Sequence, residues 1–139
     1  MEKTKINANL KGNMAFEMKI NGHTVITDTV FENGGNNLGP SPKALLLAGL
    51  IGCSGIDIMT IVKKMRLDVK DVHVEIEAES RDEDPKIYNY IKIIYKFIGT
   101  NLEYKKLERA VKLSLEKYCG VAAMLEKAVP ISYEIQIIE

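Results

Sequence analysis

Two cysteines are the side chains of this 139-residue chain with the most distinctive chemistry. Cys53 lies within a long apolar segment, whereas Cys119 stands at a break between two helical patterns, just before Gly120. A pair of thiols can be oxidised reversibly and can close a disulfide, although free cysteine is also a common inert residue of protein cores. The residues alone leave both interpretations open for each cysteine.

The local sequence favours Cys119 as the thiol that ionises more readily. A helix beginning at Gly120 would direct its free N–H groups and its positive end toward the Cys119 sulfur. Cys53 is followed one helical turn later by Asp57, and a nearby carboxylate disfavours a thiolate. Asp57 could accept a proton or could hold a neighbouring element by accepting an N–H group. We favour the second role, because buried carboxylates usually need donors.

Other kinds of site receive little support from the sequence. The two histidines, His23 and His73, do not form a metal-binding motif with each other or with the cysteines, so we expect no metal and no cofactor. The glycines between residues 34 and 39 do not match a phosphate-binding motif and predict a surface loop. No clustered serine, histidine and aspartate indicates a hydrolase.

Nineteen basic and nineteen acidic side chains cancel, which argues against nucleic acid or an anionic membrane as a partner. The first residues do not resemble a secretion signal, so a cytoplasmic location is expected. Residues 44–62 are apolar with Asp57 as their one charge, and we interpret them as a buried or subunit-interface helix rather than a membrane span.

The first part of the chain predicts a β-hairpin and then a long helix. The two strands of the hairpin are expected at residues 14–20 and 23–27, with a turn at Asn21-Gly22 between them. A third strand could follow at 29–32. Ser41 and Pro42 are typical of a helix start, and the helix is expected to end near residue 66. Gly49, Gly52 and Gly55 leave one side of this helix bare, so that another backbone could approach it or a substrate cleft could run along it.

The second part predicts a hairpin of residues 72–79 and 87–98, with one acidic face in water. Helical patterns follow up to Cys119 and over 120–128, and Pro130 precedes a last strand at 131–137. The expected order is β-β-(β)-α-β-β-α-α-β. This is an α+β fold, and we expect one domain over residues 1–139.

These segments carry a resemblance to a known family. Gly39-Pro40-Ser41-Pro42, the apolar helix that reaches Cys53, its continuation from Asp57 to Lys64, and the stretch 116–125 around Cys119 resemble the OsmC/Ohr family of thiol peroxidases, across nearly the whole chain. The resemblance implies an intertwined homodimer in which antiparallel sheets wrap around long central helices. It also implies active sites at the subunit interface.

The family's chemistry, carried over to this chain, makes Cys53 the peroxidatic cysteine and Cys119 the resolving cysteine. Cys53 would take an oxygen from an organic peroxide or hydrogen peroxide as a sulfenate, Cys119 would close the disulfide, and an external dithiol would reduce it. A Cys119 helix end that also lies against Cys53 would lower the pKa of the attacking thiol.

The chain departs from the family in the charged groups around the thiols. The family uses an arginine from its N-terminal region and a glutamate early in the long helix, but the arginines here are Arg66, Arg81 and Arg109, and Lys43 stands ten residues before Cys53. Lysine supplies charge without the rigid two-pronged geometry of arginine, so Lys43 is a supporting candidate for a rebuilt arrangement.

Two further functions stay open beside the peroxidase. The same cleft at the subunit interface, lined by Leu50, Ile56 and Met59, could bind a small apolar ligand without any role for the thiols. Alternatively, the disulfide could act as a redox-sensing switch without turnover.

Overall fold

The computed structural model describes residues 2–139. The chain forms two compact units, Met1–Leu47 and Ala48–Glu139, and each is described here by itself. The expectation of a single domain over 1–139 stays a prediction. The α+β class is confirmed, with two three-stranded sheets and three α-helices among the described residues.

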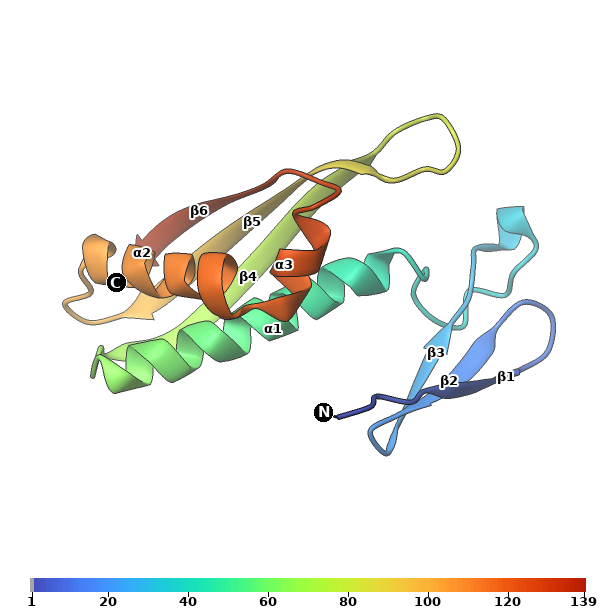
Figure 1. The fold of residues 1–139 in the computed structure, drawn as a ribbon, viewed down its shortest axis with the longest axis horizontal. Helices are drawn as coiled ribbons and strands as arrows, with labels where there is room; N and C mark the ends of the chain where they lie inside the picture. Colours follow the sequence, from blue (N-terminus) through green and yellow to red (C-terminus); the bar gives the residue numbers. More distant parts are fainter. Residues whose placement is uncertain (1) are drawn as a thin grey trace. The chain divides into compact units, whose positions relative to one another are not determined.

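The first unit contains an antiparallel sheet in the order β1-β2-β3 (Figure 1). Its strands are β1 (Asn7–Leu10), β2 (Phe16–Ile20) and β3 (His23–Thr27). Asn21 and Gly22 have φ angles of 49° and 82°, the left-handed values that a two-residue hairpin turn requires, as predicted. The strand that completes this sheet is β1, which precedes the hairpin in the sequence. The prediction of a strand at residues 29–32 is therefore wrong. That stretch includes a short 3-10 turn, η1 (Phe31–Asn33), instead.

The reason is the carboxylate of Asp28, which organises the loop after β3. Asp28 is 3% exposed and accepts the backbone N–H groups of Thr29, Asn36 and Leu38 at 2.7, 3.2 and 3.1 Å. The Leu38 N–H contributes most to holding the pKa of Asp28 below its usual value, against the opposing effect of burial. These bonds curl the chain around one side chain, which an extended strand could not do.

The second unit is built on the sheet β4-β5-β6 (Figure 1). β4 (Val69–Ser80) and β5 (Tyr88–Gly99) form the predicted antiparallel hairpin. β6 (Ile131–Ile138) joins β5 in parallel, which differs from the expected antiparallel pairing. The segment between β5 and β6 is long enough to return the chain to the same end of the sheet, because it contains α2 (Tyr104–Leu113), the π-helical turn η2 (Ser114–Tyr118) and α3 (Gly120–Leu125).

The sheet has a buried face and an exposed face, as its alternating residues predict. On β5 the core-facing side chains are Ile91, Ile93, Tyr95 and Phe97, each at most 1% exposed. On the other face, Lys96 forms an ion pair of 2.9 Å with Glu75 of β4. Figure 1 shows α1, α2 and α3 gathered on one side of this sheet. The hydrophobic core of the second unit lies between these helices and the sheet.

The long helix α1 (Ala44–Lys64) begins in the first unit and continues through the second. It starts two to three residues later and ends slightly earlier than the sequence predicted. Leu50, Ser54, Ile58 and Val62 recur every four residues and form its buried stripe. Cys53 and Asp57 each directly precede a residue of this stripe, so both thiol and carboxylate lie at its flank, half-buried.

Within residues 2–139, α1 is the one helix with the length and apolar composition to cross a bilayer.

Candidate redox site

The structure brings three predicted site residues together. Cys53 and Asp57 come from α1, and Cys119 comes from the junction between η2 and α3. The two Sγ atoms and a carboxylate oxygen of Asp57 all lie within 4.8 Å of one another. Both cysteines are free thiols. Two sulfurs at this distance need only a small local movement to form a disulfide.

Cys119 occupies the N-cap position of α3, as its sequence context predicts. Its Sγ accepts the backbone N–H of Ala122 at 3.3 Å. The prediction that this geometry makes Cys119 the readier thiolate is wrong, however. The thiol is 2% exposed, and burial, assisted by the contact with Cys53, raises its pKa from 9.0 to about 11. Desolvation therefore outweighs the N–H group at the helix end, and Cys119 stays protonated at neutral pH.

Asp57 holds a neighbouring element through a hydroxyl group rather than the expected N–H group. Ser114 Oγ donates to Asp57 Oδ2 at 3.0 Å and lies 3.4 Å from the carbonyl oxygen of Ser54. Ser114 is fully buried and is the first residue of η2, so this contact ties the π-helical turn to α1. It also fixes the orientation of the carboxylate beside the two thiols.

A second hydrogen bond supports the same part of α1 from the sheet. Tyr95 of β5 donates its O–H to Ser54 Oγ at 2.8 Å, and both side chains are fully buried. Burial raises the pKa of Tyr95 to about 12, so its hydroxyl remains a donor at any physiological pH. Ser54, Tyr95 and Ser114 were not among the site residues predicted from the sequence. The sequence signal that could have pointed to them is a serine, Ser54 or Ser114, at a helical position expected to be buried, because a buried hydroxyl needs a hydrogen-bond partner.

The remaining predicted residue, Lys43, precedes α1 in the first unit and is half-buried. Its supporting role stays a prediction.

The cluster of Cys53, Asp57 and Cys119 also offers two sulfurs and one oxygen to a cation. His73 lies on the exposed face of β4, where it contacts Glu75, and therefore does not join that cluster. The expected absence of a metal stays a prediction.

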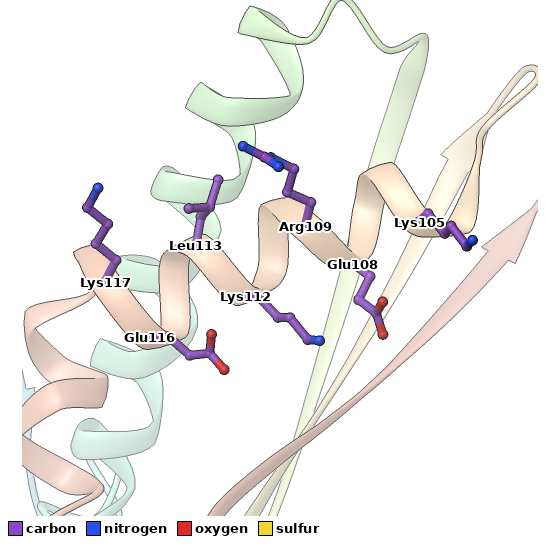
Figure 2. A pocket seen from close by; sticks show the side chains of 7 residues that line it. All are labelled: Lys105, Glu108, Arg109, Lys112, Leu113, Glu116 and Lys117. Carbon is purple, nitrogen blue, oxygen red and sulfur yellow. The ribbon is translucent and has the colours of Figure 1, made fainter.

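Two hollows adjoin this region of the second unit. The first, called here the α1–α2 groove, has a volume of about 550 Å³ and is lined chiefly by Asp57, Thr60, Ile61, Lys64, Arg109 and Leu113. Arg109 and Leu113 also border a shallower hollow along α2 and η2, shown in Figure 2. Asp57 therefore connects the thiol cluster to a groove with basic side chains.

The second hollow, called here the apolar cleft, has a volume of about 280 Å³ and lies between α1 and the sheet. Its walls include Ile51, Ile56, Met59, Val72, Val74 and Tyr95. Ile56 and Met59 thus line a cleft as predicted, whereas Leu50 does not. Leu50 is fully buried in the stripe of α1 that faces the core.

This chain is similar to known proteins in sequence and in fold. A family model described as OsmC-like protein matches residues 34–134. Protein YhfA of Escherichia coli is 39% identical over 117 residues, which is 84% of each chain. The crystal structure of a hypothetical protein from Aquifex aeolicus has a TM-score of 0.86 with 36% identity and covers both chains completely.

A more distant structure shares the fold alone. The organic hydroperoxide resistance protein OsmC of Legionella pneumophila has a TM-score of 0.70 at 18% identity, covering 98% of each chain. The family match and the fold thus agree with each other. Because the family model matches most of its length, this chain belongs to the OsmC/Ohr family.

Proposed function

We propose that this protein is a thiol-dependent peroxidase that reduces an organic peroxide or hydrogen peroxide through Cys53, with Cys119 as the resolving thiol. The observation that carries the proposal is a pair of free thiols within 4.8 Å that differ in exposure. Cys53 is half-buried, whereas Cys119 is 2% exposed. An oxidant therefore reaches Cys53 first, and Cys119 is held close enough to react with the product.

In the first step, the Cys53 thiolate attacks the terminal oxygen of the peroxide. The O–O bond breaks, the sulfur gains an S–O bond and loses two electrons, and the alcohol or water leaves with a proton. Cys119 does not compete for the peroxide, because burial raises its pKa to about 11 and keeps it protonated. The two thiols thus have separate roles.

In the second step, the Cys119 sulfur attacks the Cys53 sulfenic acid, and water leaves as the disulfide forms. The proton of Cys119 needs an acceptor, and Asp57 is the carboxylate within 4.8 Å of both sulfurs. The hydrogen bond from Ser114 occupies Oδ2 and leaves the second oxygen of Asp57 for this transfer. An external dithiol then reduces the disulfide by thiol–disulfide exchange, which makes a reducing cytoplasm the fitting location.

The assembly we propose is a homodimer in which a second copy covers the open side of α1. Ile56 is 71% exposed on that helix. A Cβ atom added at Gly49, Gly52 or Gly55 would meet nothing within 4 Å in this chain. This apolar surface is typical of a subunit interface, and the balanced charge of the chain gives no reason to expect nucleic acid or a membrane there.

The apolar cleft supports a second candidate, the binding of a small apolar ligand. At about 280 Å³ it is near the lower limit of ligand pockets, and its walls are almost entirely hydrophobic. Such a protein would need neither thiol. A redox sensor would need one oxidation event and no repeated turnover.

The experiment that separates these functions measures peroxide consumption and thiol content together. Reduced protein is mixed with limiting cumene hydroperoxide or hydrogen peroxide, and free thiols and intact mass are followed, first without and then with excess dithiothreitol. A peroxidase loses two thiols, gains one intramolecular disulfide and consumes many equivalents of peroxide once dithiothreitol is present. A sensor forms the disulfide but turns over slowly. If both thiols persist under excess peroxide, the proposal is rejected in favour of ligand binding.

A further inference from the structure

The cluster of Cys53, Asp57 and Cys119 also has the composition of a metal-binding site. Each residue presents one donor atom, and the two sulfurs and the carboxylate oxygen lie within 4.8 Å of one another. Among residues 2–139, it is the one group of three or more cysteine, histidine or acidic side chains so placed. The expectation of no metal rested on the absence of a histidine motif, and the histidines take no part in this cluster. The fold thus assembles a donor set that no short sequence motif contains.

The spacing of the donors suits a small tetrahedral ion. Cys53 and Asp57 are four residues apart on α1, which places both on the same face of the helix, and Cys119 approaches from the junction of η2 and α3. Two sulfurs bound to one tetrahedral zinc ion lie roughly 3.8 Å apart, since each Zn–S bond is about 2.3 Å long. Because the sulfurs here are at most 4.8 Å apart, a shift of about 1 Å or less brings both onto one ion.

Two of the three donors are held in place by hydrogen bonds from outside the cluster. Ser114 Oγ donates to Asp57 Oδ2 at 3.0 Å, and the backbone N–H of Ala122 donates to Cys119 Sγ at 3.3 Å. Ser114 and Ala122 are buried, so water does not compete for either contact. Hydrogen bonds of this kind orient metal ligands and strengthen metal binding. The cluster is therefore a positioned set of ligands and not three freely rotating side chains.

The donor types determine which ion fits. Two thiolates favour zinc over Mg²⁺ or Ca²⁺, which prefer oxygen ligands, and zinc also accepts a carboxylate oxygen. Cys119 is 2% exposed, whereas Cys53 and Asp57 are half-buried, so a fourth ligand position on their side can be taken by water. Three protein ligands and one exchangeable position make a site that can take up and release its ion, unlike a closed structural zinc site.

We propose that the reduced protein binds one Zn²⁺ ion through Cys53, Cys119 and Asp57, and that this ion makes the thiols unreactive. Two Zn–S bonds and one Zn–O bond form, and the protons of the thiols pass to the solvent. The bound cation shares the electron pairs with which a thiolate attacks a peroxide or an alkylating reagent. A Cys53–Cys119 disulfide has no thiolate to offer, so metal binding and the disulfide exclude each other. This inference goes beyond the proposed function and needs only reduced thiols. The ion is an inhibitor, and no step of the peroxidase cycle uses it.

The first test measures zinc binding to reduced protein without any peroxide. Competition with a chromogenic zinc chelator at neutral pH gives the affinity and the stoichiometry, and Co²⁺ in place of zinc gives thiolate-to-cobalt charge-transfer bands where sulfur is bound. We expect one ion per chain, release of protons on binding and no competition from Mg²⁺. Protein whose disulfide has been closed with diamide should bind no zinc.

Matched variants test the ligands and the outer contact. Asp57→Asn keeps both thiols but replaces the carboxylate by an amide, and should weaken zinc binding by about a hundredfold. Ser114→Ala removes the hydrogen bond to that carboxylate and should weaken binding by about tenfold. Tyr95→Phe removes a buried hydroxyl nearby without touching a ligand, and Asp82→Asn removes an exposed carboxylate, so both should bind as wild type does. Urea unfolding shows whether each variant is folded.

The second test asks whether zinc makes the thiols unreactive. Iodoacetamide should alkylate Cys53 at least about tenfold more slowly in zinc-loaded wild type than in metal-free protein, and a chelator should restore the rate. If wild type binds no zinc, if Asp57→Asn binds it as tightly as wild type, or if zinc leaves alkylation unchanged, the inference is rejected, and peroxide consumption alone decides the peroxidase proposal. If zinc binds as expected but metal-free protein does not react with peroxide, the peroxidase proposal fails and the metal site remains.

Discussion

The middle of α1 and the junction of η2 with α3 each present one thiol, but in contrasting surroundings. Cys53 is half-buried on a helix with one open side. Cys119 sits at a helix N-terminus with an N–H donor at 3.3 Å and yet has its pKa raised to about 11. The comparison teaches that a helix end does not by itself make a reactive thiol. Desolvation can exceed the stabilisation that one backbone N–H group provides.

The largest effect expected from this difference is on peroxide consumption. Cys53→Ser should lower the second-order rate constant by about a thousandfold or more, because it removes the sulfur that takes the oxygen. Cys119→Ser should leave the first oxidation nearly unchanged but leave the sulfenic acid unresolved. Stopped-flow measurement of peroxide loss checks both variants. An unaffected Cys53→Ser variant would reverse the roles assigned to the two regions.

The next effect concerns the ionisation of Cys119. Site-resolved alkylation by iodoacetamide should be roughly a hundredfold slower at pH 8 in the native protein than in urea-unfolded protein, reflecting a pKa near 11 rather than 9.0. Because the folded state favours the protonated thiol, its contribution to stability is complete below pH 9 and is lost between pH 9 and 11. Equal alkylation rates for native and unfolded protein at pH 8 would contradict the burial argument.

A smaller effect is expected at the carboxylate between the two regions. Asp57→Asn should slow disulfide closure by about 10- to 100-fold, since the Cys119 proton loses its acceptor, while the first oxidation changes little. Raising the pH should partly restore closure. Single-turnover disulfide formation is the measurement, and Asp82→Asn in the exposed turn between β4 and β5 is the matched control. Equal slowing of both steps would indicate a structural role for Asp57 instead.

The smallest effect is on stability. Tyr95→Phe leaves the buried Ser54 hydroxyl without its donor and should lower the free energy of unfolding by about 1 kcal/mol. Urea unfolding measures it. Tyr104→Phe, in which the removed hydroxyl belongs to a side chain that is 48% exposed, should leave the midpoint unchanged. A similar loss in both variants would mean that the bond between the sheet and α1 has no special importance.

Much of the fold could be predicted because several of its helices, strands and turns have clear local sequence patterns. The Asn21-Gly22 turn, the alternation along β4 and the apolar run of α1 depend on residues close together in the sequence. The parallel pairing of β6 could not be predicted, since it depends on how far the segment between β5 and β6 carries the chain. The strand β1 was missed because its four residues, Asn7–Leu10, are exposed and include no β-branched or aromatic side chain.

The candidate site was predictable in its members but not in its electrostatics. Cys53, Asp57 and Cys119 could be named from residue type and from the family resemblance. The partners Ser54, Tyr95 and Ser114 depend on a register between α1, the sheet and η2 that no local pattern encodes. For the same reason the raised pKa of Cys119 was missed, since its burial comes from residues distant in the sequence.

The most direct test of the account is to locate the first sulfur that peroxide oxidises. Wild-type protein is mixed with less than one equivalent of cumene hydroperoxide in the presence of dimedone, quenched within milliseconds to seconds, and mapped by peptide mass spectrometry. The account predicts a dimedone adduct on Cys53 at the earliest times and a Cys53–Cys119 disulfide afterwards. A first adduct on Cys119 would contradict it.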